Sequence, residues 1–258
     1  MIDLIPEAKT FAIPPISNFY VGVAARGTSG KIYFGANFEF TGHALSFTVH
    51  AEQAAVVQAM AGGETGLEMI AVSAAPCGYC RQFLNELTTA TTLQIQIPGH
   101  PLMALPQLLP AAFGPRDLGV EAALMAPQWH GLTLDAPDPL TAAALAAANA
   151  SYAPYSHAYS GVALETRDGA IVSGAVAENA AYNPSLSPLE AAIVNLVIGA
   201  RKSYADIVDA VLVEVADAPV SQESATRAVL ASIGDVALRV FQIPRHASRG
   251  EGGAGGAG

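Results

Sequence analysis

The sequence contains few cysteines and few basic residues, with two cysteines and 12 lysines and arginines among 258 residues. A secreted protein built on a disulfide framework normally has more cysteines in a shorter chain. No apolar run reaches the ~18 residues that a membrane-spanning helix needs. No stretch near the amino end joins a basic start to a long apolar run, so we expect no signal peptide and a cytoplasmic protein.

The shortage of basic residues also limits the partners of the protein. The 22 acidic residues give a net charge of -10, and such a surface repels phosphate backbones and anionic lipid heads. The sequence also lacks the basic stripe with aromatic residues that binds single-stranded nucleic acid. We therefore expect a small, uncharged substrate and neither a nucleic-acid nor a membrane partner.

Apolar residues make up 52% of the chain, which is enough for a sizeable core, and the sequence repeats itself once. A segment that begins at Pro14 and one that begins at Ala153 carry the same small residues at the same spacing. Two copies are too few for a solenoid, so we interpret the repeat as an internal duplication that gives two similar domains. The recurring residues are Pro15, Ser17, Gly22, Val23, Ala24, Gly30, Gly35 and Ala36, which return as Pro154, Ser156, Gly161, Val162, Ala163, Gly169, Gly174 and Ala175.

Hydrophobic periodicity predicts the same order of elements in both copies. In the first copy we expect strands over 20–26, 31–35, 67–73 and 93–97, and helices over 49–61 and 77–87. In the second copy we expect strands over 160–166, 170–174, 210–215 and 237–243, and helices over 188–199 and 221–233. Strands that alternate with helices after an opening hairpin predict α/β domains with mixed β-sheets.

The expected domain boundaries follow from these elements. An amino-terminal segment (1–14) precedes the first copy (15–100), and a proline-rich linker with an Ala-rich helix (101–150) leads to the second copy (151–245). A glycine-rich tail (246–258) ends the chain. The tail lacks the strand and helix that a phosphate-binding glycine motif requires, so we expect it to be disordered.

Two segments of the first copy each open a predicted helix with residue types that bind metals. His50 stands in TVHAEQAAV, and Cys77 and Cys80 stand in APCGYC, one helix and one strand later. A catalytic zinc takes three protein ligands and leaves one position for water or substrate. Helix amino ends also favour thiolate over thiol. We therefore expect these three residues to hold one zinc ion, and Arg81 to hydrogen-bond a thiolate sulfur.

Glu52 lies two residues after His50, which directs its carboxylate beside the metal rather than at it. Zinc lowers the pKa of a bound water to about 7, and a neighbouring carboxylate can move its proton. H-x-E followed by P-C-x-x-C is the pattern of zinc-dependent nucleobase deaminases. A closed structural zinc site would need a fourth ligand, and the chain has no further cysteine. A redox-active cysteine pair would leave His50 and Glu52 unexplained.

With these motifs the chain resembles the cytidine deaminases, and most closely their two-domain, homodimeric bacterial type. The resemblance runs from about Pro15 to Val240 and is carried by FGANFEF, TVHAEQAAV, PCGYCRQFLNEL, FGPRDL and AENAAYNP. It implies two similar three-layer α/β/α domains, with zinc and catalysis in residues 15–100 and a degenerate, non-catalytic copy in residues 151–245.

The second copy lacks the metal-ligand residues of the first. In the sequence alignment Pro188 stands where His50 would be, and APVSQE (Ala218–Glu223) replaces APCGYC. Glu190 pairs with Glu52 in this alignment, and without a metal we expect it to be a structural carboxylate at a helix start. We therefore expect one zinc per chain.

The resemblance also implies which residues contact the substrate. Asn37 and Glu39 match residues that bind the ribose hydroxyls, and an amide or a carboxylate can bond a hydroxyl group. Phe19 matches an aromatic residue that packs against the pyrimidine. Ala51 is expected to offer its backbone N–H, and Ala75 its carbonyl oxygen, to the base.

The expected function is that of a hydrolase in pyrimidine salvage, which converts cytidine and 2′-deoxycytidine to uridine and 2′-deoxyuridine with release of ammonia. The resemblance implies a homodimer in which Phe113, in the linker, reaches the active site of the partner subunit. One alternative is a deaminase of the same scaffold that acts on a modified nucleoside or a nucleotide. Another is a non-catalytic nucleoside-binding protein, which the retained His50, Glu52 and cysteines disfavour.

Overall fold

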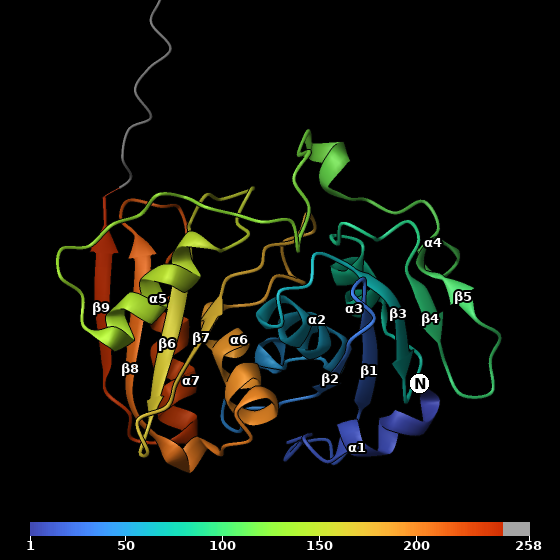
Figure 1. Ribbon diagram of the computed structural model, residues 1–258, viewed down its shortest axis with the longest axis horizontal. Helices are drawn as coiled ribbons and strands as arrows, with labels where there is room; N and C mark the ends of the chain where they lie inside the picture. Colours follow the sequence, from blue (N-terminus) through green and yellow to red (C-terminus); the bar gives the residue numbers. More distant parts are fainter. Residues whose placement is uncertain (245–258) are drawn as a thin grey trace, which may run out of the picture.

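A computed structural model describes residues 1–244 and contains two mixed β-sheets side by side (Figure 1). The first sheet has the strand order β2-β1-β3-β4-β5, and the second has the order β7-β6-β8-β9. In both sheets the opening hairpin is antiparallel, and the third and fourth strands along the chain pair in parallel. The prediction of two similar α/β units with mixed sheets is confirmed. The predicted disordered tail lies outside the described residues.

The elements of the first copy lie close to their predicted positions. Two short helices, η1 and α1, come before the first strand, and the sequence analysis did not predict them as separate elements. In chain order the elements are η1 (Ile2–Leu4), α1 (Ile5–Lys9), β1 (Gly22–Gly27), β2 (Ile32–Ala36), η2 (Leu45–Phe47), α2 (Ala51–Ala61), β3 (Leu67–Val72), α3 (Gly78–Leu84) and β4 (Gln94–Gln96).

The linker is more structured than its prolines predicted, and the second copy follows its predicted order. The linker elements are β5 (Met103–Ala104), α4 (Leu105–Leu108), η3 (Pro115–Leu118) and α5 (Pro139–Asn149). The second copy contains β6 (Ser160–Thr166), β7 (Ile171–Ala175), α6 (Pro188–Val194), the π-helical turn η4 (Asn195–Gly199), η5 (Tyr204–Asp206), β8 (Ile207–Val215), α7 (Glu223–Ile233) and β9 (Leu238–Ile243).

Two glycines of the first copy let helices pack closely on opposite faces of the sheet. A Cβ atom on Gly22 would lie 2.7 Å from the backbone nitrogen of Lys9 in α1, and one on Gly35 would lie 2.1 Å from the carbonyl oxygen of Ala51 in α2. Gly35 pairs with Val23, the neighbour of Gly22, so the two glycines face opposite sides of the sheet. The unit therefore has three layers, with α1 on one face and α2 on the other.

The second copy repeats this packing at the same two places. A Cβ atom on Gly161 would lie 2.4 Å from the carbonyl oxygen of Ala144 in α5, and one on Gly174 would lie 2.1 Å from the backbone nitrogen of Ala192 in α6. The recurring glycines of the sequence thus mark the helix–sheet contacts of both copies. The linker helix α5 takes the place in the second copy that α1 takes in the first.

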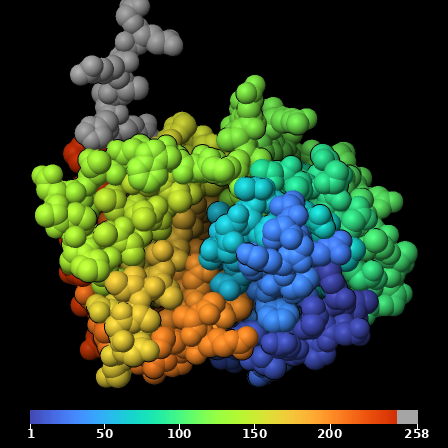
Figure 2. All heavy atoms as spheres, viewed as in Figure 1, coloured from blue at the N-terminus to red at the C-terminus, as the bar shows by residue number. Residues whose placement is uncertain are grey.

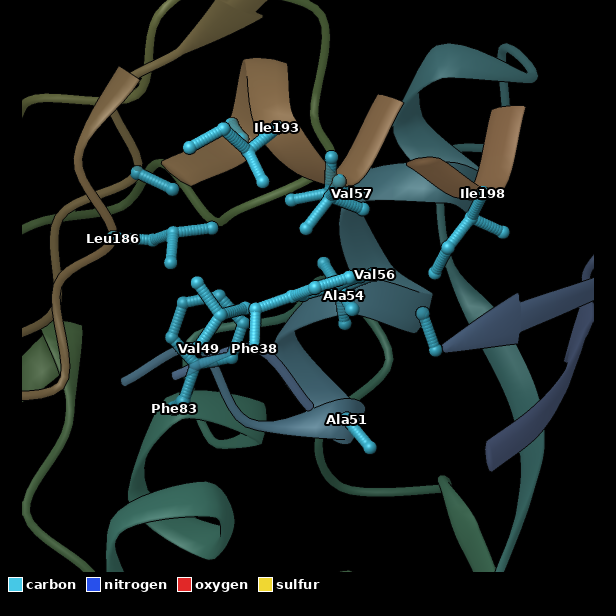
Figure 3. Close-up of a cluster of buried hydrophobic side chains, with 14 of the residues drawn as sticks. Phe38, Val49, Ala51, Ala54, Val56, Val57, Phe83, Leu186, Ile193 and Ile198 are labelled. Carbon is cyan, nitrogen blue, oxygen red and sulfur yellow. The ribbon is translucent and has the colours of Figure 1, made fainter. Parts of the chain in front are cut away.

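The two halves share one hydrophobic core, in which α2 packs against α6. Val57 of α2 lies near Ile193 of α6 and Ile198 of η4 within this buried cluster (Figure 3). Gln58 Nε2 donates a hydrogen bond of 2.6 Å to Asn195 Oδ1 across the same contact. In the space-filling view the halves form one continuous body, with the linker over its upper edge (Figure 2). Within residues 1–244, no helix is long and apolar enough to cross a membrane.

Candidate active site

The two segments with metal-ligand residues begin two helices whose amino ends meet. His50 directly precedes α2, Cys77 directly precedes α3, and Cys80 lies in the first turn of α3. Helix α2 runs away from this end of the sheet and β3 runs back to it, so the start of α3 returns to the start of α2. The chain order α2, β3, α3 therefore brings together three residues that are distant in sequence.

The distances among these three residues fit one zinc ion. Cys77 Sγ lies 3.6 Å from both Cys80 Sγ and His50 Nδ1, and His50 Nδ1 lies 3.1 Å from Cys80 Sγ. A tetrahedral zinc with ordinary bond lengths separates two sulfurs by about 3.8 Å, and a sulfur from a nitrogen by about 3.5 Å. Among the described residues no further histidine, cysteine or carboxylate joins the group. The donor set fits a zinc with one coordination position open.

The pKa values of the two cysteine thiols are shifted in opposite directions. The pKa of Cys77 is lowered to about 5, because the Cys80 thiol hydrogen-bonds its sulfur and the N–H groups of Cys80 and Tyr79 also point at it. The pKa of Cys80 is raised by its hydrogen bond with Cys77 and by burial. Thiolate is the form that binds zinc, and a bound cation favours the deprotonation of both sulfurs.

Glu52 lies in the first turn of α2, next to this group, and only 4% of its surface is exposed. Burial raises the pKa of its carboxyl group, although a hydrogen bond with Cys80 opposes this effect. Glu52 does not belong to the group of three ligands. A buried carboxyl beside an open metal position is suited to holding and moving a proton.

A cavity of about 320 Å³ opens over the metal group and contains most of the residues expected to contact substrate. Phe19, Asn37, Glu39, Ala51 and Ala75 all line it, together with Glu52 and the three ligand residues. The remaining residues of its wall are Ser17, Val21, Thr48 and Ala74. The volume lies within the range of small-molecule sites.

Asn37 fixes the chain that carries Phe19. Its Nδ2 atom donates to the carbonyl oxygen of Phe19 at 2.9 Å, and its Oδ1 atom accepts from the N–H group of Val21 at 2.9 Å. The side chain of Phe19 is 59% exposed, although it lines the cavity. An exposed ring at a cavity wall is available to stack on a ligand.

Glu39 holds the neighbouring turn of the same loop. Its carboxylate accepts hydrogen bonds from the N–H groups of Ile16 and Ser17, at 2.8 and 2.9 Å, and from the Ser17 hydroxyl at 2.5 Å. Burial alone would raise the pKa of Glu39, but these bonds outweigh it and lower the pKa. The carboxylate is therefore ionised, and its remaining lone pairs can accept from a ligand hydroxyl.

Two of the expected site residues lie outside this cavity. Arg81 donates from Nε to the carbonyl oxygen of Pro76 at 2.8 Å and from a terminal nitrogen to that of Leu108 at 2.8 Å. Its hydrogen bonds within the described chain thus reach carbonyl groups, and the expected bond to a thiolate sulfur is wrong. Phe113 does not line the cavity of its own chain, and its side chain is 46% exposed.

Two side chains that are not among the expected site residues contact His50. Gln53 accepts from the N–H group of His50 at 3.0 Å and donates to the carbonyl oxygen of Pro184 at 3.1 Å, which ties the first ligand to the second half. Tyr79 stacks on the His50 ring with centroids 5.0 Å apart. The position of Gln53, three residues after a helix cap, is a signal that could have identified it.

The structure corrects the alignment of the two copies by one residue. The isolated bridge between Phe38 and Val49 recurs between Ala177 and Leu186, which makes Ser187 the counterpart of His50. Glu190 therefore corresponds to Gln53 and not to Glu52, whose place Leu189 takes. Both Gln53 and Glu190 accept from the backbone N–H of the residue that caps their helix. The prediction that Glu190 lies at a helix start is confirmed, and its carboxylate caps that helix.

Comparisons with known proteins agree with this geometry. Residues 1–95 match a family model described as the cytidine and deoxycytidylate deaminase zinc-binding region, and residues 105–227 match a second model of the same description. A cytidine deaminase of Photobacterium profundum is 48% identical over 232 residues, which are 90% of this chain and 78% of that protein. A cytidine deaminase of Yersinia pestis (strain Pestoides F) is 52% identical over 236 residues, which are 92% of this chain and 80% of that protein.

Among solved structures, a cytidine deaminase from Mycobacterium tuberculosis is 32% identical in sequence, with a TM-score of 0.41. The match covers 44% of this chain and 94% of that one. The curated relatives, in contrast, are similar to this chain over both of its halves.

Proposed function

Because the chain belongs to the cytidine deaminase family, we propose that it hydrolyses cytidine and 2′-deoxycytidine to uridine and 2′-deoxyuridine and releases ammonia. The observation that carries this proposal is the buried carboxyl of Glu52 in one cavity with His50, Cys77 and Cys80. Zinc held by these three ligands supplies the Lewis acid and the water activation that hydrolysis of an amidine needs.

Glu52 moves protons in two steps of this reaction. It accepts a proton from the attacking water and delivers it to N3 of the base while the water oxygen forms a bond to C4. It then takes the proton of the new hydroxyl group and passes it to the amino group, and the bond between C4 and N4 breaks. The raised pKa of Glu52 supports this role, because the group must both accept and donate a proton near neutral pH.

The cavity wall supports an uncharged nucleoside as the substrate. Asn37 and Glu39 bind the sugar hydroxyls, Phe19 packs on the pyrimidine, the N–H group of Ala51 contacts the ring carbonyl, and the Ala75 carbonyl oxygen accepts from the 4-amino group. All five residues line one cavity. No lysine or arginine lies among the described residues of its wall, and a phosphate group beside Glu39 would be repelled.

We further propose that the protein is a homodimer in the cytoplasm and acts in pyrimidine salvage. Phe113 is exposed, and its carbonyl oxygen accepts from Gln82 and Asn85 of the α3 region, at 2.8 and 3.1 Å, which fixes its backbone. An exposed aromatic side chain on a fixed backbone is suited to a subunit interface. Phe113 would then line the cavity of the partner subunit.

A substrate panel tests the proposed function. The zinc-loaded protein is supplied with cytidine, 2′-deoxycytidine, cytidine monophosphate and a ring-modified cytidine, and ammonia release is measured for each. The proposal predicts turnover of the first two at rates well above that of the nucleotide. Turnover of only the nucleotide or the modified nucleoside would contradict the substrate assignment, and cytidine binding without ammonia release would indicate a non-catalytic binding protein.

A further inference from the structure

A cavity of about 510 Å³, which no step of the proposed reaction uses, is lined mostly by residues of the second half, together with Ser46 and Phe47 of the first half. It lies where the duplication puts the counterpart of the catalytic cavity, because Ser156, Glu178 and Ser187 in its wall correspond to Ser17, Glu39 and His50. We call this space the second cavity. Its volume lies in the range of small-molecule sites.

One end of the second cavity repeats the sugar end of the first. Glu178 accepts from the N–H groups of Tyr155 and Ser156, at 2.9 and 3.1 Å, and from the Ser156 hydroxyl. Glu39 receives the same three bonds from Ile16 and Ser17. The carboxylate and the turn that it holds are therefore retained in a copy that has lost its metal ligands.

The wall of the second cavity also contains a buried carboxyl. Glu190 is 6% exposed, and its Oε2 atom accepts from the Ser187 N–H group at 2.8 Å. The hydrogen bonds of this carboxyl with described residues all come from Ser187, and Glu190 lines the cavity. Burial raises the pKa of Glu190 to about 7, so a substantial ionised fraction is present at neutral pH. A carboxylate has about four acceptor positions, so the Glu190 carboxylate can accept a further hydrogen bond from an N–H group of a ligand in the cavity.

The rest of the wall selects for an uncharged ligand with a flat ring. Three aromatic residues, Phe47, Tyr155 and Tyr182, supply ring surfaces, and Tyr182 is 66% exposed. No lysine, arginine or histidine lies among the described residues of the wall, so two carboxylates face any phosphate without a compensating cation. A nucleoside satisfies these conditions, whereas a nucleotide does not.

We propose that the second cavity binds a uridine-like nucleoside without converting it, with the sugar toward Glu178 and the N3–H group of the base toward Glu190. A uracil ring carries the N–H donor that a carboxylate accepts, and a cytosine ring does not carry it at this position. Leu189 stands where Glu52 stands in the first copy. Among the described residues, the one group with three metal-ligand atoms lies in the first copy. The nucleoside is therefore bound and left unchanged.

The number of uridine molecules bound per chain tests this proposal. Equilibrium dialysis of labelled uridine against the zinc-loaded, full-length protein is expected to give two sites per chain, one in each cavity. Val220→Phe fills the wall of the second cavity and is expected to leave one site. The matched control Val208→Phe lies outside both cavities at a similarly exposed position, 46% against 45%, and is expected to retain two.

A second variant tests the same site without adding bulk. Glu190→Gln keeps an acceptor for the Ser187 N–H group but removes the charge, so uridine affinity at one of the two sites should fall about 10-fold or more. One uridine site per chain in the wild type, or two full-affinity sites in both Val220→Phe and Glu190→Gln, would overturn the proposal. Cytidine turnover is measured on the same samples. If cytidine is turned over but only one uridine site is found, the binding proposal for the second cavity is refuted and the proposed function is not. If two uridine sites are found without turnover, the proposed function is contradicted and the binding proposal is supported.

Discussion

His50 Nδ1 lies 3.1 Å from Cys80 Sγ, although 30 positions separate the two residues in the chain. Their contact joins the amino ends of α2 and α3, which belong to the same layered unit. A zinc ion held between them links two helices that are otherwise connected through β3. Metal binding and the stability of the first half are therefore expected to change together.

Replacing one sulfur ligand should remove zinc and lower stability. Cys80→Ser is expected to reduce the zinc content from about one ion per chain to a small fraction. Zinc at roughly 1,000 times its Kd stabilises a folded protein by about 4 kcal/mol, so the Tm should fall toward that of chelator-treated wild type. Metal analysis and thermal melts check both effects. Full zinc content in Cys80→Ser would contradict the ligand assignment.

The glycines under the two helices provide a matched pair of variants. A Cβ atom on Gly35 would lie 2.1 Å from a backbone atom of α2, and one on Gly174 would lie 2.1 Å from a backbone atom of α6. Both alanine variants should lose about 1–3 kcal/mol of unfolding free energy through overpacking. Gly35→Ala also shifts the helix that begins after His50, and a displacement of about 1 Å can reduce kcat about 100-fold. Gly174→Ala should keep kcat near that of the wild type.

Steady-state kinetics on the folded fraction of both glycine variants, with urea titrations, measure these effects. Equal losses of kcat in Gly35→Ala and Gly174→Ala would mean that general destabilisation, and not displacement of α2, accounts for the change.

The buried Glu190 should make stability depend on pH. Its pKa is about 7 in the folded protein against an ordinary value of 4.5, so the folded state binds the proton more tightly. The unfolding free energy should therefore fall as the pH rises from 4.5 through about 7, by about 3 kcal/mol at ~1.4 kcal/mol per tenfold change in proton affinity. Glu190→Gln removes this dependence and places at this position the residue that the first copy has, Gln53.

Thermal melts of the wild type and Glu190→Gln at pH 5 and pH 8 check the prediction. The Tm difference between the two proteins should be larger at pH 8, with the variant the more stable. A Tm difference that is the same at both values would show that Glu190 keeps an ordinary pKa in the folded protein.

Sequence reasoning grouped the residues of the candidate site, which the structure brings together, because they follow short local rules. His50, Cys77 and Cys80 stand at helix starts with metal-ligand spacing, and Glu52 follows at two residues. Hydrophobic patterning also gave the order of the strands and helices, since strands and helices alternate in each copy after the opening hairpin. The recurring glycines were recognised as a repeat, although their role in helix packing is visible only in three dimensions.

Features that depend on contacts across the fold were not predictable in the same way. Arg81 donates to the carbonyl oxygen of Leu108 because the linker helix α4 packs against α3, which no local pattern indicates. The sequence alignment of Glu190 with Glu52 is wrong, because it matched two residues of the same type and ignored the spacing of the flanking elements. The β-bridges and helix caps shift the alignment by one position.

The role of Glu52 is tested most directly by Glu52→Gln, measured for zinc content and for ultraviolet-monitored cytidine turnover in the same sample. Glutamine keeps the shape of the side chain but cannot carry the proton, so we expect about one zinc per chain and a loss of kcat of about 1,000-fold or more. The control Glu68→Gln changes an exposed carboxylate of β3 that pairs with Arg26 of β1, and it should keep full turnover. Near-normal turnover by zinc-loaded Glu52→Gln would contradict the mechanism.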